Sequence, residues 1–302
     1  MEQFIVDERF ATGLRPLLSQ LPPLVREQFT PQDNAVQRNF RLALFQALSR
    51  LDERELTVDQ ITAAQLPELL ALAVSINPPR FQPTSLTPGK LAQEKAGSYV
   101  AGYLMTQFVD RLAKVGNPPQ MVEELTVDAG DIMLAQFQRL RFNFNQRFTI
   151  ADYLTDCKAR TGLLTAITAK QAATLAGYDQ ETVHLAGQIG TNLGVAFSIL
   201  NELERVQSSI VAFTTMVTAG QYPLPMLFAV EKHRDWFSQF FGQVHRPGKD
   251  QVEKARQLSV VSLEDAHEIA SELLNQAQLD IAVLPKGSQQ CLSRLVNRLK
   301  QV

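Results

Sequence analysis

The segment from Gly187 to Leu200 constrains the fold more than any other part of the chain. It reads GQIGTNLGVAFSIL, carries no charged residue and has glycines at 187, 190 and 194. Because glycine has no Cβ, a helix with this spacing lets other backbones approach closely. A helix that is apolar on all sides belongs inside a protein rather than on its surface. We therefore expect a central helix of a larger bundle.

Helical periodicity continues along the rest of the sequence. Apolar residues recur at steps of three and four in 42–51, 66–73 and 273–281, and no sustained alternating segment reads as a strand. Proline and glycine interrupt the pattern at LPPL, INPPRFQPTSLTPGK, GNPP, GQYPLP, HRPGKD and LPKG. These short breaks favour antiparallel neighbours. The sequence predicts an all-α fold, a single large helical bundle over residues 1–302.

Composition and charge exclude two classes of protein. Of the 302 residues, 45% are hydrophobic and 20% charged, which is ordinary for a globular protein with a sizeable core. The formal net charge is −2 and no long basic run occurs, so we expect no nucleic-acid partner. The amino terminus does not resemble a leader, and no stretch of about 18 uncharged apolar residues predicts a membrane span. We expect a cytoplasmic protein.

Neither the cysteines nor the histidines predict a metal site. Cys157 and Cys291 lie far apart without CxxC spacing, so no disulfide framework or zinc knuckle is indicated. The four histidines show neither HxxxH nor HExxH spacing. Both thiols are expected to be reduced.

Five segments, in their order along the chain, resemble the trans-isoprenyl diphosphate synthase family. They read AGSYVAGYL, GDIMLAQFQRLRFNFNQRFTIADYL, KARTGLLTA, GTNLGVAFSILNELER and GQYPLP. The resemblance covers roughly residues 97–302, and it rests on the order and spacing of the segments together. It implies an all-helical enzyme fold that condenses isopentenyl diphosphate with an allylic diphosphate.

The resemblance also implies two aspartate-rich DDxxD motifs, whose carboxylates hold Mg²⁺ ions that bridge the allylic diphosphate. Aspartates one helical turn apart supply the oxygen ligands that Mg²⁺ requires. The first motif falls on INPPRFQPTSLTPGK, where no Asp or Glu occurs from Val74 to Leu91 and two prolines break the helix. We predict no metal site there.

The second motif falls on FSILNELER. Its three aspartate positions carry Asn201, Glu202 and Arg205, and Ser198 stands where the family has glutamine. One interpretation is an ordinary helix end with an ion pair between Glu202 and Arg205, which are three residues apart. A second is that Arg205 replaces Mg²⁺ and binds diphosphate directly. A third is weak metal binding through Glu202 and Asn201. We expect no metal cofactor.

Four residues are candidate diphosphate contacts by the same resemblance. Arg160 and Thr161 match the family's Lys-Thr pair, and an arginine can bind phosphate through two nitrogens at once. Arg38 or Arg41 stands in for the family's amino-terminal G-G-K-R segment. No residue is assigned a catalytic role.

These observations leave three functions open. The first is a non-catalytic subunit that forms a homodimer or pairs with an active polyprenyl diphosphate synthase. The second is an active trans-prenyltransferase with altered metal dependence. The third is a metal-free protein that binds an isoprenoid or other lipid in an apolar hollow between helices.

Overall fold

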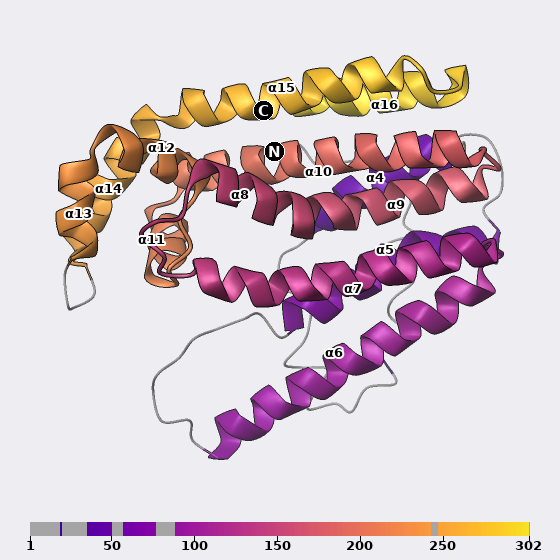
Figure 1. Cartoon of the computed structure of the whole chain (residues 1–302), viewed down its shortest axis with the longest axis horizontal. Coiled ribbons are helices and arrows are strands. Elements are labelled where there is room, and N and C mark those ends of the chain that lie inside the picture. The colour runs from indigo at the N-terminus through magenta and orange to yellow at the C-terminus, as the bar shows by residue number, and fades with distance from the viewer. Residues whose placement is uncertain (1–18, 20–34, 50–56, 77–87, 243–246, 302) are drawn as a thin grey trace.

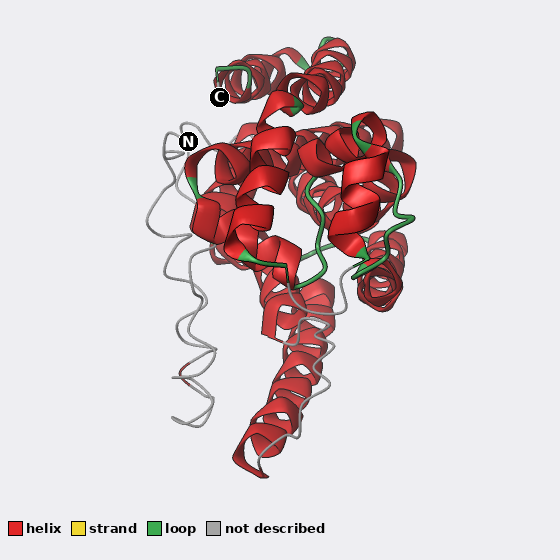
Figure 2. Ribbon diagram, turned by 90° about the vertical axis from the view of Figure 1, so that its left-hand side faces the viewer, coloured by secondary structure: helices red, strands yellow, loops and turns green. Residues whose placement is uncertain are grey.

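The computed structural model describes residues 19, 35–49, 57–76, 88–242 and 247–301 (Figure 1). Throughout these ranges the chain forms helices and turns and contains no strand (Figure 2). The predicted all-α fold is thus confirmed. The extent of the domain, residues 1–302, stays a prediction.

The helices lie side by side in layers (Figure 1). The first half of the described chain forms α4 (Ala35–Ser49), α5 (Val58–Ile76), α6 (Pro88–Lys114), α7 (Pro119–Phe142), α8 (Ile150–Cys157), the π-helical turn η1 (Lys158–Gly162) and α9 (Leu163–Leu175). The second half forms α10 (Gln180–Ser208), α11 (Ile210–Thr218), α12 (Leu224–Lys232), α13 (Arg234–Phe241), α14 (Lys249–Val261), α15 (Leu263–Ile281) and α16 (Lys286–Leu299).

The central helix is α10, as the sequence predicts. It packs most extensively against α9 and α15, and it buries residues on all sides in its middle third. By length and mean hydropathy it is the one helix of the described chain that is able to cross a membrane, yet 67% of its most apolar 18 residues are buried inside the fold. This is the profile of a helix in the core of a bundle.

Two glycines set the distance between α9 and α10. A Cβ at Gly190 would lie 2.7 Å from the carbonyl oxygen of Thr165, and a Cβ at Gly194 would overlap the Thr165 hydroxyl. That hydroxyl donates back to the carbonyls of Thr161 and Gly162, 2.9 Å away in each case, so it is not free to move aside. The two helices therefore meet backbone to backbone at this point.

Short motifs in the sequence explain where several helices begin. Thr149 caps α8 by accepting from the amide of Asp152, and the Asp152 carboxylate accepts from the amide of Thr149. Asp179 caps α10 by accepting from the amide of Thr182 at 2.8 Å. Each cap satisfies an amide that has no partner inside its own helix.

We expect Gly194→Ala to lower the free energy of unfolding by about 1–3 kcal/mol, because the added methyl forces α9 and α10 apart. Urea denaturation measures this change. The matched control is Gly102→Ala in α6, where a Cβ meets nothing within 4 Å. There the same substitution should raise stability by about 0.5–1 kcal/mol, since alanine is the better helix former. Equal effects at the two positions would contradict the close approach.

Candidate functional site

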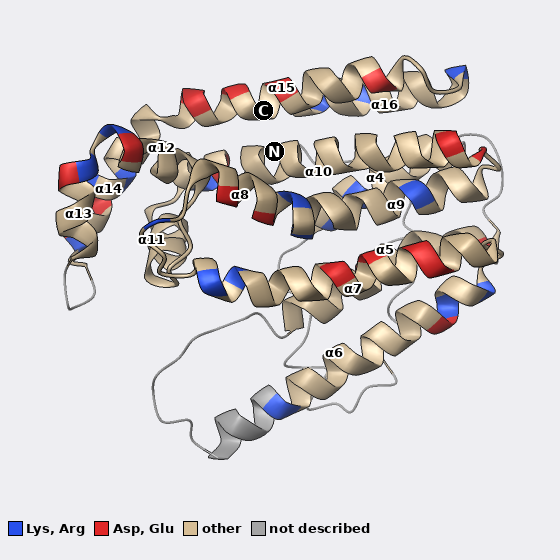
Figure 3. Cartoon of the chain, in the orientation of Figure 1, with Lys and Arg blue, Asp and Glu red and all other residues tan. Residues whose placement is uncertain are grey.

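A network of buried polar side chains lies where α8 and η1 pack against the carboxyl-terminal half of α10. Figure 3 shows the acidic residues of α8 next to basic residues at its junction with α9. The network consists of two hydrogen-bonded groups that both start from α8. Asp156 binds Arg139 of α7 and Arg160 of η1, and Tyr153 binds Glu202 of α10, which also accepts from the Leu224 amide of α12.

Glu202, the one carboxylate left in the second motif, points into the fold. Its Oε2 accepts a hydrogen bond from the Tyr153 hydroxyl at 2.8 Å and another from the backbone amide of Leu224 at 2.9 Å. Leu224 is the first residue of α12, so the carboxylate also faces a helix amino terminus. Burial raises the pKa of Glu202 above its ordinary value, although both hydrogen bonds act in the opposite direction.

The Tyr153 hydroxyl, which donates to Glu202, stays protonated. Burial, followed by the adjacent Glu202 carboxylate, raises the pKa of Tyr153 well above its ordinary value. The same surroundings keep a neighbouring thiol neutral, since burial raises the pKa of Cys157 to about 11, while a hydrogen bond with Ser198 acts against this. Cys157 is therefore a buried, unreactive thiol, as expected.

Asp156 holds two arginines at once. Arg160 donates to it from Nε at 2.9 Å and from Nη2 at 2.5 Å, and Arg139 donates from Nη1 at 3.0 Å. The Asp156 side chain is 2% exposed, against 11% for Arg139 and 29% for Arg160. The anion bound to Arg160 in this fold is thus a carboxylate of the same chain.

Arg160 lies in the π-helical turn η1, which connects α8 to α9. A π turn contains an extra residue and shifts the side chains that follow it relative to those before it. Gly162 ends the turn against α10, where a Cβ would lie 3.1 Å from methyl groups of Thr191 and Val195. Thr161 sits in the same turn, half-buried, and its carbonyl accepts from the hydroxyl of Thr165.

The predicted ion pair between Glu202 and Arg205 is wrong. Glu202 turns toward Tyr153 and α12, whereas the Arg205 side chain is exposed and makes no hydrogen bond or ion pair within the described chain. Asn201 is half-buried beside it. Helical spacing brings Glu202 and Arg205 near each other, but the buried hydroxyl and amide attract the carboxylate more strongly than an exposed cation. Diphosphate binding by Arg205 stays a prediction.

The donor set of the second motif does not fit Mg²⁺. This ion needs several oxygen ligands in octahedral geometry, and its sites in proteins usually include carboxylates. Here Asn201 and Arg205 supply an amide and a cation, and Glu202 is hydrogen-bonded inside the fold. Over the residues that the structure describes, no three His, Cys, Asp or Glu gather where they could hold a metal ion. The first motif position, in 77–87, lies outside those residues.

Arg41 is not available to a diphosphate. Its Nε and Nη2 donate to the two carboxylate oxygens of Glu68 at 2.6 and 2.7 Å, and both side chains are buried. The pair joins α4 to α5, so its role is structural. Arg38 is half-buried one turn earlier on α4, and its Nε is buried with no hydrogen-bond partner in the described chain. No described contact brings Arg38 or Arg41 to the network around Arg160.

Sequence reasoning missed three members of the network. Asp156 and Arg160 stand four residues apart, a spacing typical of helical ion pairs, so this contact was readable from the sequence. Arg139 and Tyr153 carry no such signal, because their partners come from other helices.

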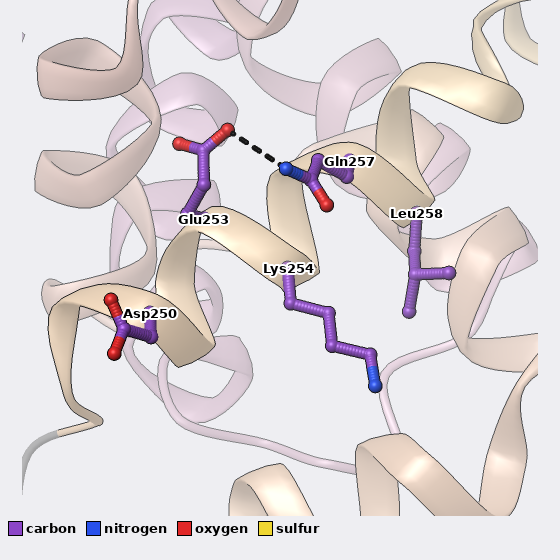
Figure 4. Close-up of a pocket in the computed structure, with 5 residues that line it drawn as sticks. All are labelled: Asp250, Glu253, Lys254, Gln257 and Leu258. Atoms are coloured by element: carbon purple, nitrogen blue, oxygen red, sulfur yellow. Dashed lines mark hydrogen bonds between the residues drawn. The ribbon is translucent and has the colours of Figure 1, made fainter.

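A surface hollow of about 320 Å³ lies on α14, apart from this network (Figure 4). It is lined by Asp250, Glu253, Lys254, Gln257 and Leu258. Glu253 accepts a weak hydrogen bond from Gln257 at 3.5 Å, and Lys254 lies over the ring of Trp236, 5.2 Å from its centre. Its charged residues are of both signs, and Leu258 adds an apolar side chain to the lining.

Comparison with known proteins places the fold among the polyprenyl synthases. The sequence profile of the Polyprenyl synthetase family matches residues 89–257. A geranylgeranyl pyrophosphate synthase from Lactobacillus brevis superposes with a TM-score of 0.80 at 17% identity, over 98% of this chain and 96% of the other. A heptaprenyl diphosphate synthase from Staphylococcus aureus gives 0.78 at 17% identity, over 100% and 99%. At such identity these two likenesses show the fold alone.

Two curated relatives are similar over part of their length. A prenyl transferase of Cyanidium caldarium is 25% identical over 203 residues, which make up 65% of this chain and 61% of the relative. A decaprenyl-diphosphate synthase of Dictyostelium discoideum is 25% identical over 198 residues, 63% and 42% of the two chains. The matched region thus spans about two fifths to three fifths of these relatives.

We expect Asp156→Asn to lower the free energy of unfolding by about 2–3 kcal/mol, because it leaves two guanidinium groups together without a carboxylate. The loss should fall somewhat below the roughly 3–5 kcal/mol typical of breaking a buried ion pair, since Arg160 keeps some contact with solvent. The control is Asp110→Asn, which breaks an exposed pair with Lys114 and should cost less than about 0.5 kcal/mol. Losses of similar size would show that Asp156 is not essential to the network.

The Glu202 carboxyl should make stability depend on pH. Its pKa is raised above 4.5 in the folded chain, so its contribution to stability is largest below that pH and is lost as pH rises through the folded pKa. Glutamine keeps an acceptor for Tyr153 and Leu224 but does not titrate. We expect the unfolding free energy of the wild type minus that of Glu202→Gln to decrease as pH rises from about 4 to 7. An increase would mean that the fold stabilises the charged carboxylate instead.

Proposed function

Because the chain belongs to the polyprenyl synthetase family, we propose that it acts in isoprenoid biosynthesis as a non-catalytic subunit that assembles with an active polyprenyl diphosphate synthase. The observation that carries this proposal is the position of Glu202. The surviving carboxylate of the second motif is half-buried and accepts hydrogen bonds from the Tyr153 hydroxyl and the Leu224 amide.

Prenyl transfer in which diphosphate departs requires positive charge close to the leaving group. The leaving group carries several negative charges, and an active site accelerates its departure by neutralising them. Metal ions bound by carboxylates supply that neutralisation in sites of this kind. In this chain the corresponding positions offer one engaged carboxylate, an amide and an arginine, which supports a protein that does not perform the reaction itself.

The arrangement around Arg160 supports the same proposal. A diphosphate that approaches Arg160 meets a guanidinium group whose Nε and Nη2 already bind Asp156. To bind, it must displace a carboxylate that Arg139 also holds. Displacement would also leave the buried Asp156 without one of its partners, which is costly in a buried site.

A subunit role suits what the chain retains. The apolar core, the α9–α10 contact and the caps of α8 and α10 support a stable fold, and stability is what a partner subunit contributes. We propose that the chain works in the cytoplasm, and that its partner carries intact aspartate-rich motifs. The names of the similar proteins, which include synthases of decaprenyl and solanesyl diphosphates, support an isoprenoid pathway as the setting.

We expect the purified chain to form no prenyl product. The assay follows labelled isopentenyl diphosphate with short and long allylic diphosphates in about millimolar Mg²⁺, beside a synthase with intact motifs as positive control. Product above the no-enzyme background would contradict the proposal and favour an active transferase. Co-purification from the native cell should recover a motif-bearing synthase, and mixing should change its product length or its thermal stability. Native mass spectrometry that finds a bound lipid instead would favour the lipid-binding function.

A further inference from the structure

The loop between α7 and α8 contains a residue in a rarely occupied backbone conformation. Phe144 has a φ of 61°, and it is the one residue other than glycine in the described chain whose φ is positive. A residue with a side chain adopts this left-handed conformation at an energetic cost, because its Cβ crowds the carbonyl oxygen that follows. Such strain persists only where the surrounding structure holds the residue in place.

A backbone contact with Gly220 holds Phe144. The Phe144 amide donates to the carbonyl oxygen of Gly220 at 2.9 Å, in the connection between α11 and α12 (Figure 1). Gly220 has a φ of 71°, and a Cβ on it would lie 2.5 Å from the Phe144 nitrogen. The Phe144 side chain is 53% exposed, so the backbone rather than the ring makes the closest part of this contact. We call the pair Phe144 and Gly220 the Phe144 latch.

The Phe144 latch joins the two segments that bind Glu202. The loop of Phe144 leads into α8, whose Tyr153 hydroxyl donates to the Glu202 carboxylate at 2.8 Å. The connection that contains Gly220 leads into α12, whose first amide, at Leu224, donates to the same carboxylate oxygen at 2.9 Å. Contacts therefore run in a closed circuit from Glu202 to α8, through the latch to the start of α12, and back to Glu202.

The turns on both sides of the latch have hydrogen bonds of their own. On the α7 side, the amide of Asn145 donates to the carbonyl of Phe142 at 3.1 Å, and its side-chain oxygen accepts from the amide of Arg147 at 3.0 Å. On the other side, the amide of Gly220 donates to the carbonyl of Val217 at 3.0 Å. Each turn keeps these bonds if the latch opens, so opening is a local event that leaves the bundle folded.

We propose that the Phe144 latch is a conformational switch that controls access to Glu202. The structure shows the closed state, in which the latch keeps the amino terminus of α12 on the carboxylate. In the open state Phe144 relaxes to a negative φ, Gly220 moves away, and the Leu224 amide leaves Glu202, so that one carboxylate oxygen faces solvent. The strain in Phe144 reduces the free-energy difference between the two states, which makes the open state accessible.

This inference goes beyond the proposed function, because it concerns the exposure of one carboxylate and holds whether or not the chain transfers prenyl groups. Its tests below measure amide exchange and chemical labelling, so their failure leaves the subunit role to be judged by its own assay.

Gly220→Ala tests the link between the latch and Glu202. The added methyl would collide with the Phe144 backbone, so it favours the open state. We expect the Leu224 amide to exchange with solvent about fivefold faster or more, by NMR in deuterated water. Labelling of Glu202 with a carbodiimide and an amine, measured by mass spectrometry, should increase with it. The matched control is Gly116→Ala, which has a similar φ of 77° but meets nothing within 4 Å, and which should change neither signal.

Two substitutions of Phe144 separate backbone strain from packing of the ring. Both Phe144→Gly and Phe144→Val remove the ring, but glycine accepts a positive φ, whereas a β-branched residue resists it more than phenylalanine does. We expect the Leu224 amide to exchange no faster than in the wild type with glycine, and about fivefold faster or more with valine. Exchange of the core amides of α10 verifies that each variant is folded.

Equal exchange rates in the two Phe144 variants would overturn the proposal, because the ring and not the backbone would then hold the contact. So would an unchanged Leu224 amide in Gly220→Ala. Faster exchange at Leu224 without more labelling of Glu202 would also overturn it, since the latch would then not control the carboxylate.

Discussion

The close approach of α9 and α10 at Thr165 holds the π turn, and with it Arg160, against the central helix. Gly190 and Gly194 let the two backbones touch, and the Thr165 hydroxyl fills the space that side chains would occupy. Because η1 leads directly into α9, this contact also fixes the π turn against α10. The turn follows directly on α8, whose Tyr153 and Asp156 bind Glu202 of α10 and Arg160 of the turn.

That placement gives a carboxylate at the end of α10 two mutually exclusive uses. To bind a cation it must turn its oxygens away from Tyr153 and Leu224, so that their lone pairs are free. To hold α8 and α12 against α10 it must face inward, where Tyr153 and the first amide of α12 supply its hydrogen bonds. A half-buried carboxylate with two good donors loses both hydrogen bonds if it turns outward, which lowers the stability of the fold. In this structure Glu202 therefore holds α8 and α12 against α10.

The sequence predicts the features that depend on local composition. It misses the side-chain contacts between helices that are far apart in the chain. The segment 187–200 identifies the central helix from its composition alone, because it is uncharged and has glycines at regular spacing. Asn201, Glu202 and Arg205 lie near the end of that helix, and their assignment to the second motif stays a prediction. Family membership is confirmed by the profile match to residues 89–257. Glu202 nevertheless pairs with Tyr153 and Leu224 rather than Arg205. Arg41 pairs with Glu68 of another helix, which no periodicity reveals.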